Sequence, residues 1–149
     1  MPKEIKSPTS DTTIQLQLPE EAFALLPVLR PRLQQALDHG VHESTFFDWV
    51  QRIVSGQAHV WVFREHGRIT GAGLTQFLTY TRHKTLHIVL FQADSFDLCY
   101  PLLVEVERFA RDNGCIAMEQ WGRAGWSREL PKVVAGFREV YRVMRKDLV

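Results

Sequence analysis

The pattern of apolar and polar residues predicts a strand and then a helix in the first forty residues. Over Thr12–Leu18 every second residue is apolar, which is the period of a half-buried strand. Glu20–Asp38 is predicted to be helical, and the glycine at position 40 is suited to end the helix. Pro27 and Pro31 lack a backbone donor and crowd the preceding turn, so we expect them to break this helix into two pieces.

A second helix and three successive strands are predicted in the middle of the sequence. Ser44 is a suitable N-cap for a helix that runs through Val54 and carries its apolar residues on one face. Short turns separate the three strands, which makes them an antiparallel meander over His59–Arg64, Arg68–Tyr80 and Thr85–Gln92. The glycines at positions 71 and 73 indicate a bulge or a close backbone approach in the second of these strands.

The last third of the sequence alternates between helix and strand. Apolar residues at helical spacing predict a helix from about residue 99 to 110, with Pro101 in its first turn and its cap near Asp97. A strand over Cys115–Trp121 follows and must be parallel to the preceding strand if the helix is a crossover. The remaining elements are a short helix over Ser127–Val134, capped by its first residue, and a final strand over Val140–Lys146.

This element order predicts an α/β fold of the mixed-sheet (α+β) type. We expect a central, mostly antiparallel sheet with one parallel β–α–β crossover and helices on both faces. The 149 residues suit one compact domain, expected over residues 12–149 after a flexible tail at residues 1–11. The tail is rich in Pro, Ser and Thr, and a docking arm onto a partner is the alternative interpretation.

Composition argues against several classes of function. The formal net charge of +1 gives no overall attraction to nucleic acid or anionic lipid, and no apolar run approaches the length of a membrane span. A basic cluster near residue 142 lacks the interleaved aromatic residues of a nucleic-acid surface: Arg138, Arg142, Arg145 and Lys146. The six histidines lack metal-binding spacing, so no metal is expected. Cys99 and Cys115 form no disulfide framework, which indicates a reducing compartment.

Two local motifs and the element order resemble the GNAT superfamily of N-acetyltransferases over nearly the whole chain. Gly136-Phe137 followed by Val143–Leu148 is similar to the closing strand of that superfamily. The string GC…E…GRxGW over residues 114–126 is similar to tailed-phage proteins described as acetyltransferase-like. The resemblance implies a GNAT-like fold, a phage origin and transfer of an acetyl group from acetyl-CoA to an amine.

The same resemblance implies where acetyl-CoA would bind. Backbone groups of Leu90, Phe91 and Gln92 would pair with the pantetheine amides, and the next residues would face the pyrophosphate: Ala93, Asp94, Ser95 and Asp97. The superfamily has two glycines in this loop, where the backbone approaches the phosphates closely. Here Ser95 and Asp97 replace them. Asp94 and Asp97 also bring negative charge near the phosphates, each repulsion being worth roughly 4 kcal/mol at 4 Å in an effective dielectric of 20.

Acetyl transfer requires a base for the amine, and two candidates lie on the strands that the resemblance expects to separate. Glu119 is the first choice and His87 the second, with Glu129 as a weaker third. Each also has a structural interpretation: His87 as a strand histidine satisfied by a neighbour, and Glu119 as the ion-pair partner of an arginine such as Arg123.

Two further residue groups complete the implied site. GNAT enzymes often protonate the leaving thiolate with a tyrosine of the fourth helix, but Ser127–Val134 contains none, and Tyr141 is the nearest in sequence. Three residues would line a substrate groove, with a plain packing role as the alternative for the two tryptophans: Trp121, Arg123 and Trp126.

The missing glycines and the missing tyrosine support a second interpretation. The same scaffold would then be a catalytically silent phage protein that acts in virion assembly or binds a host protein. Both interpretations place the protein in the cytoplasm of an infected bacterium, with the virion as a second location. The partners that they admit are a phage or host protein and a second copy of this chain, and neither involves nucleic acid or a membrane.

Overall fold

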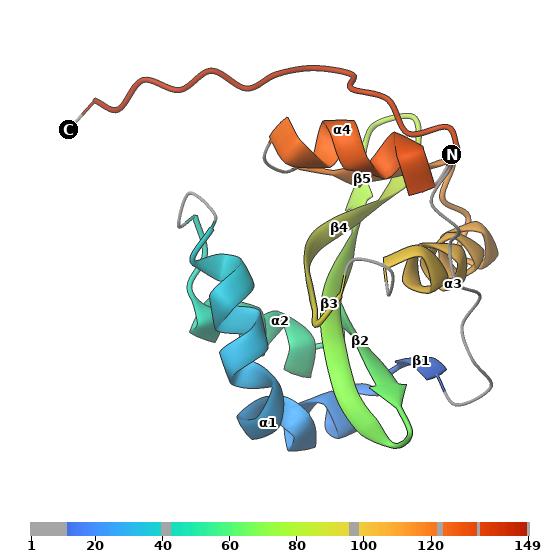
Figure 1. Ribbon diagram of the computed structural model, residues 1–149. Helices are drawn as coiled ribbons and strands as arrows, with labels where there is room; N and C mark the ends of the chain where they lie inside the picture. Colours follow the sequence, from blue (N-terminus) through green and yellow to red (C-terminus); the bar gives the residue numbers. More distant parts are fainter. Residues whose placement is uncertain (1–11, 40–42, 96–98, 122–123, 134, 149) are drawn as a thin grey trace.

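The computed structural model describes residues 12–39, 43–95, 99–121, 124–133 and 135–148 (Figure 1). The expected tail at residues 1–11 and the predicted cap Asp97 lie outside these ranges. The strands in the described ranges are β1 (Thr12–Leu16), β2 (Ala58–Glu65), β3 (Arg68–Thr79), β4 (Lys84–Ala93) and β5 (Ala117–Gln120). The helices are α1 (Pro19–Leu37), α2 (Phe46–Val54), α3 (Cys99–Asp112) and α4 (Ala124–Val133).

The strands form one mixed sheet in the order β1-β2-β3-β4-β5. The first three pairs are antiparallel, and β4 and β5 are parallel because α3 carries the chain back to the same end of the sheet. The predicted meander and the predicted crossover are therefore both confirmed. No helix in the described ranges has both the length and the apolar character needed to cross a membrane.

Helices cover both faces of the sheet, as Figure 1 shows. Successive residues of β2 point to opposite faces: Val60 and Val62 pack with the buried residues of α1 and α2, whereas Trp61 and Phe63 pack with those of α3 and α4. Each face thus has its own apolar cluster, and β2 is buried on both sides. This arrangement confirms the predicted fold class.

A bulge and a close backbone approach both occur at Gly71, the first glycine of the pair in β3. The β2–β3 register shifts between Phe63 and Arg64, which leaves Thr70 as the extra residue. A Cβ atom added at Gly71 would lie 2.9 Å from the Gln92 carbonyl oxygen and would also meet the Phe63 ring. Gly71 therefore brings β3 close to the end of β4, which is where the cofactor residues are expected.

The prediction that prolines break α1 is wrong, because the helix runs unbroken from Pro19 to Leu37 with Pro27 and Pro31 inside it. These two prolines are four residues apart and exposed, so they share the solvent face of the helix. The carbonyl groups that lose a helical donor there can bond to water. The opposite face is held against the sheet by Ala22, Leu26, Leu29 and Leu33, which are buried.

Two predicted helix starts also differ from the structure. The N-cap of α2 is Thr45 and not Ser44: the Asp48 backbone N–H donates to Thr45 Oγ1, and the Thr45 backbone N–H donates to the Asp48 carboxylate. This reciprocal capping box favours the later start. The fourth helix begins at Ala124, so Ser127 lies within it and is not its cap.

The predicted final strand is absent, because residues 137–148 have no regular secondary structure. Apolar residues occur there as adjacent pairs, Val140-Tyr141 and Val143-Met144, so an extended chain would carry apolar side chains on both of its faces. Such a strand needs cover on two sides. The described part of this chain does not supply it.

Candidate functional site

The parallel pair β4–β5 is hydrogen-bonded at one end only. The register joins Thr85–Ile88 to Ala117–Gln120, and β5 ends there. Because β4 continues to Ala93, the stretch Val89–Ala93 extends beyond the last β5 partner. The two strands are thus not joined along their full length, as the proposed binding of a ligand arm requires.

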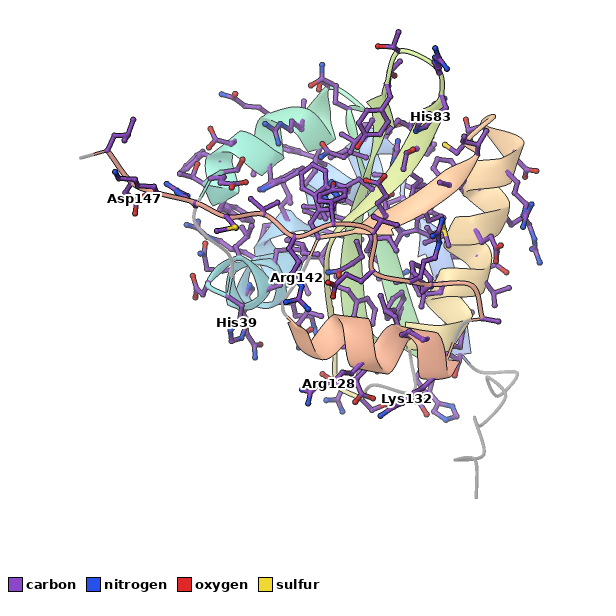
Figure 2. The ribbon with its side chains drawn as sticks, turned by 90° about the horizontal axis from the view of Figure 1, so that it is seen from above. His39, His83, Arg128, Lys132, Arg142 and Asp147 are labelled. Atoms are coloured by element: carbon purple, nitrogen blue, oxygen red, sulfur yellow. The ribbon has the colours of Figure 1, made fainter. Side chains whose placement is uncertain are left out.

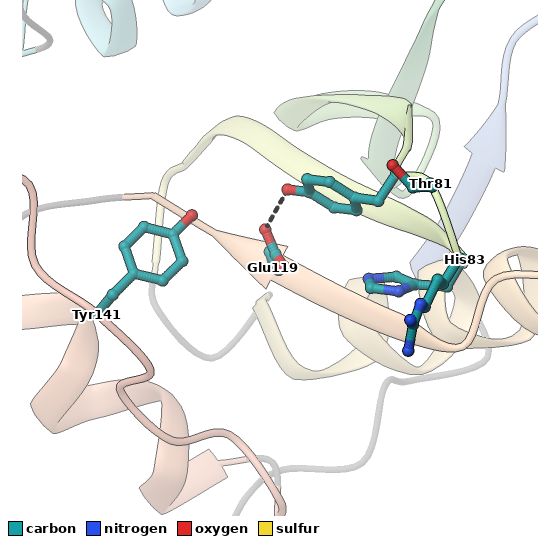
Figure 3. A pocket seen from close by; sticks show the side chains of 6 residues that line it. Thr81, His83, Glu119 and Tyr141 are labelled. Atoms are coloured by element: carbon teal, nitrogen blue, oxygen red, sulfur yellow. Dashed lines mark hydrogen bonds between the residues drawn. The ribbon is translucent and has the colours of Figure 1, made fainter.

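Glu119 lies on β5 near the end of this pairing. Its Oε2 atom accepts one hydrogen bond from the Tyr80 hydroxyl at 3.2 Å and another from the Trp121 indole N–H at 3.1 Å. Figure 3 shows the first of these bonds. Both donors bond to Oε2, and they fix the carboxylate in place. Arg123, the expected ion-pair partner, lies outside the described residues.

An open pocket of about 660 Å³ lies beside Glu119. It is lined by residues from the β3–β4 turn, from β5 and from the segment after α4. Tyr141 approaches from beyond α4, and its hydroxyl points toward Glu119 in Figure 3. The lining residues are Tyr80, Thr81, Arg82, His83, Glu119 and Tyr141. The pocket therefore combines a single carboxylate with aromatic walls and the polar turn between β3 and β4.

His87 lies directly opposite Glu119 in the β4–β5 register but is buried, with 6% of its surface exposed. Its Nδ1 atom bonds to the Gln76 side chain at 3.1 Å, and its ring packs on Trp121 at 4.3 Å between centroids. Its Nε2 atom has no hydrogen-bond partner among the described residues. Burial lowers the pKa of His87 to about 4, and the nearby Glu119 carboxylate opposes this shift only in part. His87 is therefore neutral at neutral pH, with a neighbour that satisfies one nitrogen.

The sequence analysis missed Tyr80, which follows β3 directly. Loss of hydration, and then the Glu119 carboxylate, raise the pKa of Tyr80, so its hydroxyl stays protonated at neutral pH and serves as a donor. The signal that could have found it is its position. A tyrosine at the last residue before the β3–β4 turn lies at the end of the sheet where Glu119 also lies.

A second missed residue, Arg32 of α1, binds the far end of β4. Its guanidinium donates to the Gln92 side-chain oxygen at 2.8 Å and to the Asp94 carboxylate at 2.8 Å. It also donates to the backbone carbonyls of Thr70 and Ile69 at 3.2 and 3.1 Å. A single arginine thus connects α1 to β3 and to the end of β4.

Arg32 changes the charge that an incoming phosphate would meet. Hydrogen bonding by Arg32 lowers the pKa of Asp94, so this carboxylate is ionised but paired. The net charge of the pair is zero, and the repulsion expected from Asp94 alone is reduced. The backbone N–H of Asp94 donates to the Thr70 carbonyl at 2.9 Å, which further fixes this end of the strand.

The other expected cofactor residues follow the end of β4 in different environments. Leu90 is buried against α1 and α2, and the half-buried Phe91 ring packs beside Phe63 on the opposite face. Ala93 is half-buried, and Ser95 is exposed in the bend after the strand. Their side chains are thus mostly packing groups, so a cofactor would contact this stretch through its backbone.

The expected substrate groove is only partly described. Trp121 is 52% exposed and its ring packs on His87, and its role in a groove stays a prediction. Arg123 and the side chain of Trp126 lie outside the description. The weaker base candidate, Glu129, forms an exposed ion pair with Lys132 on α4 at 3.3 Å. No group of three or more metal-ligating side chains occurs among the described residues.

Comparison with solved structures identifies the fold. An aminoglycoside N-acetyltransferase, AAC(6')-Iy, in complex with CoA superposes with a TM-score of 0.69 over 94% of this chain and 96% of its own, at 13% sequence identity. A glucosamine-6-phosphate N-acetyltransferase from Arabidopsis thaliana has a TM-score of 0.63 over 93% and 99%, at 16% identity. This chain has the GNAT fold. A predicted acetyltransferase from Clostridium acetobutylicum, solved with acetyl-CoA, has a TM-score of 0.62 over 92% and 96%, at 14% identity.

The similarity lies in the structure and not in the sequence. No protein-family model matches this sequence, and no curated protein matches it. The identities of 13 to 16% establish the shared GNAT fold alone. What this GNAT-fold chain does must therefore be argued from its own site.

Proposed function

We propose that this protein is a GNAT-type N-acetyltransferase that moves an acetyl group from acetyl-CoA to an amine. The observation that carries the proposal is the position of Glu119 at the end of the β4–β5 pairing, in an open pocket beside Tyr80 and Tyr141. A base at the end of a partly paired strand is where an amine can meet a thioester carried by β4. Glu119 belongs to the four β5 residues that pair with β4, and β4 continues beyond them.

The reaction assigns a separate task to each side chain. Acetyl-CoA, when bound, supplies a thioester whose C–S bond breaks as the new C–N bond forms. Glu119 orients the amine and accepts the proton that nitrogen loses, while Tyr80 and Trp121 hold the carboxylate in place through Oε2. Tyr141 supplies a hydroxyl on the other side of the pocket and is our candidate proton donor to the leaving thiolate. His87 stays neutral behind Trp121 and supports it.

The far end of β4 fits the rest of acetyl-CoA. Val89–Ala93 continues beyond the last described β5 partner, and the backbone groups of this stretch that do not bond to β3 would pair with the pantetheine amides. The Arg32–Asp94 pair cancels the charge of the carboxylate that would otherwise repel the pyrophosphate. Arg32 therefore reduces the electrostatic repulsion, which is one of the two objections to binding; the absent glycines are the other.

Glu119→Gln tests the proposed base. With acetyl-CoA and a panel of amines that includes a polyamine, an aminoglycoside and a lysine peptide, free thiol release should fall by on the order of 100-fold. Acetyl-CoA binding, followed by the rise in melting temperature, should be retained because Glu119 contacts the amine and not the cofactor. Glu107→Gln removes an exposed ion pair on α3 and is the matched control. Equal rates for the wild type and Glu119→Gln would rule out Glu119 as the base.

A catalytically silent phage protein is the second candidate, supported by Ser95 in the bend after β4, where the superfamily has a glycine that lets the backbone approach the phosphates. We propose for both candidates a phage origin and a place in the cytoplasm of the infected bacterium. If wild-type protein shows no melting shift at millimolar acetyl-CoA, the silent interpretation replaces the enzymatic one. Mass spectrometry of purified virions then separates an assembly role, in which the protein is retained in the particle, from a host-binding role.

A further inference from the structure

The turn between β3 and β4 places two basic side chains in the wall of the pocket beside Glu119. Arg82 and His83 both line this pocket, and Arg82 is exposed. The Tyr80 backbone N–H donates to the His83 carbonyl at 2.8 Å, and the rings of these two residues lie 5.0 Å apart between centroids. Since the Tyr80 hydroxyl also bonds to Glu119, the turn is tied to the pocket through one side chain.

The positive charge of Arg82 has no described carboxylate partner. None of the ion pairs between described residues includes Arg82. Lys84, the next basic residue after His83, has other contacts: its ammonium group donates to the Asn113 carbonyl at 2.9 Å and lies 4.0 Å from the centre of the Phe77 ring. Because an arginine stays charged at any ordinary pH, Arg82 is the permanent positive charge of the described pocket wall.

The basic residues that follow β5 have other positions or partners. Arg142 comes one position after a pocket residue, but its guanidinium pairs with Glu139 at 2.7 Å. Figure 2 shows Arg128 and Lys132 on α4, well away from His83 and the β3–β4 turn. The cation that a ligand meets in the described part of the pocket is therefore the one in the turn.

Tyr80 sets the separation between the two opposite charges of the pocket. Its hydroxyl donates to the Glu119 carboxylate at 3.2 Å, whereas its backbone belongs to the turn that carries Arg82. The carboxylate and the turn thus lie at opposite ends of one tyrosine side chain, and the ring between them offers an apolar surface. A ligand that reaches both ends needs a short apolar body.

The charges of the described pocket wall balance one another. Glu119 is its single carboxylate, and Arg82 is its single guanidinium. A polyamine or an aminoglycoside carries several ammonium groups, so one of them would bind the carboxylate while others would meet a positive charge. A ligand that has one amine and one anionic group complements both charges of the wall.

We propose that the acceptor is an amine that also carries a carboxylate or phosphate group, with the amine at Glu119 and the anionic group at Arg82. The proposal rests on the acetyl transfer proposed above for the same pocket. A guanidinium binds both kinds of anion through two parallel hydrogen bonds. Because Arg82 is exposed, we expect the anionic group to strengthen binding by about fivefold, which is roughly 1 kcal/mol.

Four ligands of similar length test the proposal by calorimetry in the presence of CoA, which has no acetyl group to transfer. 6-Aminohexanoate and 5-aminopentyl phosphate carry the anionic group, hexylamine lacks it, and 1,6-diaminohexane has a second amine in its place. At least one anionic ligand should bind about fivefold more tightly than hexylamine, and the diamine should not. The preference should nearly vanish in 1 M salt, where the screening length is about 3 Å.

Two variants show whether Arg82 is the source of the preference. Arg82→Gln should bind the anionic ligands no more tightly than hexylamine, whereas Arg111→Gln, which removes an exposed ion pair on α3, should keep the wild-type preference. A wild type that binds neither anionic ligand more tightly than hexylamine would overturn the proposal, as would a preference that Arg82→Gln retains.

The binding measurement separates this proposal from the proposed acetyl transfer. If the wild type prefers the anionic ligands through Arg82 but releases no thiol from acetyl-CoA with any of them, the transfer reaction is wrong and the site binds anionic amines without acetylating them. If thiol is released with hexylamine and the anionic ligands at equal kcat/KM, the transfer reaction stands and the role of Arg82 is wrong.

Discussion

His87 and Glu119 occupy facing positions on β4 and β5, yet their surroundings give them different chemistry. His87 is enclosed by Gln76, Trp121 and the strands, which keeps it neutral. Glu119 opens onto the pocket and accepts bonds from two donors. Both residues can be identified from the sequence as polar groups on neighbouring strands. Their different environments depend on Trp121, whose ring packs on His87 and whose indole N–H donates to Glu119.

The buried His87 makes stability depend on pH. Its pKa is about 4 in the folded protein, against 6.5 when unfolded, so the unfolded chain binds more protons between these values. The free energy of unfolding should therefore be highest above pH 6.5 and should fall by about 2 kcal/mol as the pH decreases toward 4. Urea unfolding at pH 7 and pH 4.5 measures the change.

His87→Gln is the control for this prediction, because glutamine is polar and has no proton to gain. The variant should lose most of the difference in unfolding free energy between the two pH values. His59 should contribute in the same direction, since burial also lowers its pKa. If the unfolding free energy of His87→Gln depends on pH as in the wild type, His87 is not the source of that dependence.

Arg32 shows why part of the site could not be found in the sequence. It lies 60 positions before Gln92 and 62 before Asp94, on a different element, and the sequence contains many other arginines. Nothing local marks it as the partner of the β4 end. Its contacts depend on α1 continuing through Pro31 as one helix, whereas the sequence predicted a break at Pro31, next to Arg32.

At the scale of elements, local patterns predicted the strands better than the helix ends. The alternating residues of β2, β3 and β4 meet a sheet that is covered on both faces, so pattern and packing agree. Helix α1 departs from the expected break because packing of its buried face outweighs the local effect of Pro27 and Pro31. Residues 137–148 depart from the predicted strand because no described strand pairs with them.

Gly71 is the position in the β3–β4 pair where a side chain would fit least well. Gly71→Ala should destabilise the fold by about 1–3 kcal/mol, because its methyl group would meet Phe63 and the backbone of β4. Gly73→Ala is the matched control two residues on, where a Cβ atom would have ordinary contacts of 3.6 to 3.8 Å. Thermal unfolding of both variants compares them. A Gly71→Ala protein as stable as Gly73→Ala would show that the β3–β4 approach is loose.

For the whole molecule, the element order was sufficient to predict the GNAT fold, because one parallel crossover in an antiparallel meander restricts the topology. The base candidate Glu119 was also found from the sequence. Tyr80 and Arg32 were missed because their roles arise from contacts between distant segments. The use of Val89–Ala93 as a cofactor edge stays a prediction.

Backbone hydrogen exchange with and without acetyl-CoA tests that central claim most directly. If acetyl-CoA pairs with the part of β4 beyond β5, exchange should slow at those amides of Val89–Ala93 that do not bond to β3. The amides of β1, at the other edge of the sheet, should be unchanged and serve as the internal reference. Exchange at Val89–Ala93 that is unaltered by millimolar acetyl-CoA, or protection confined to another part of the sheet, would contradict the account.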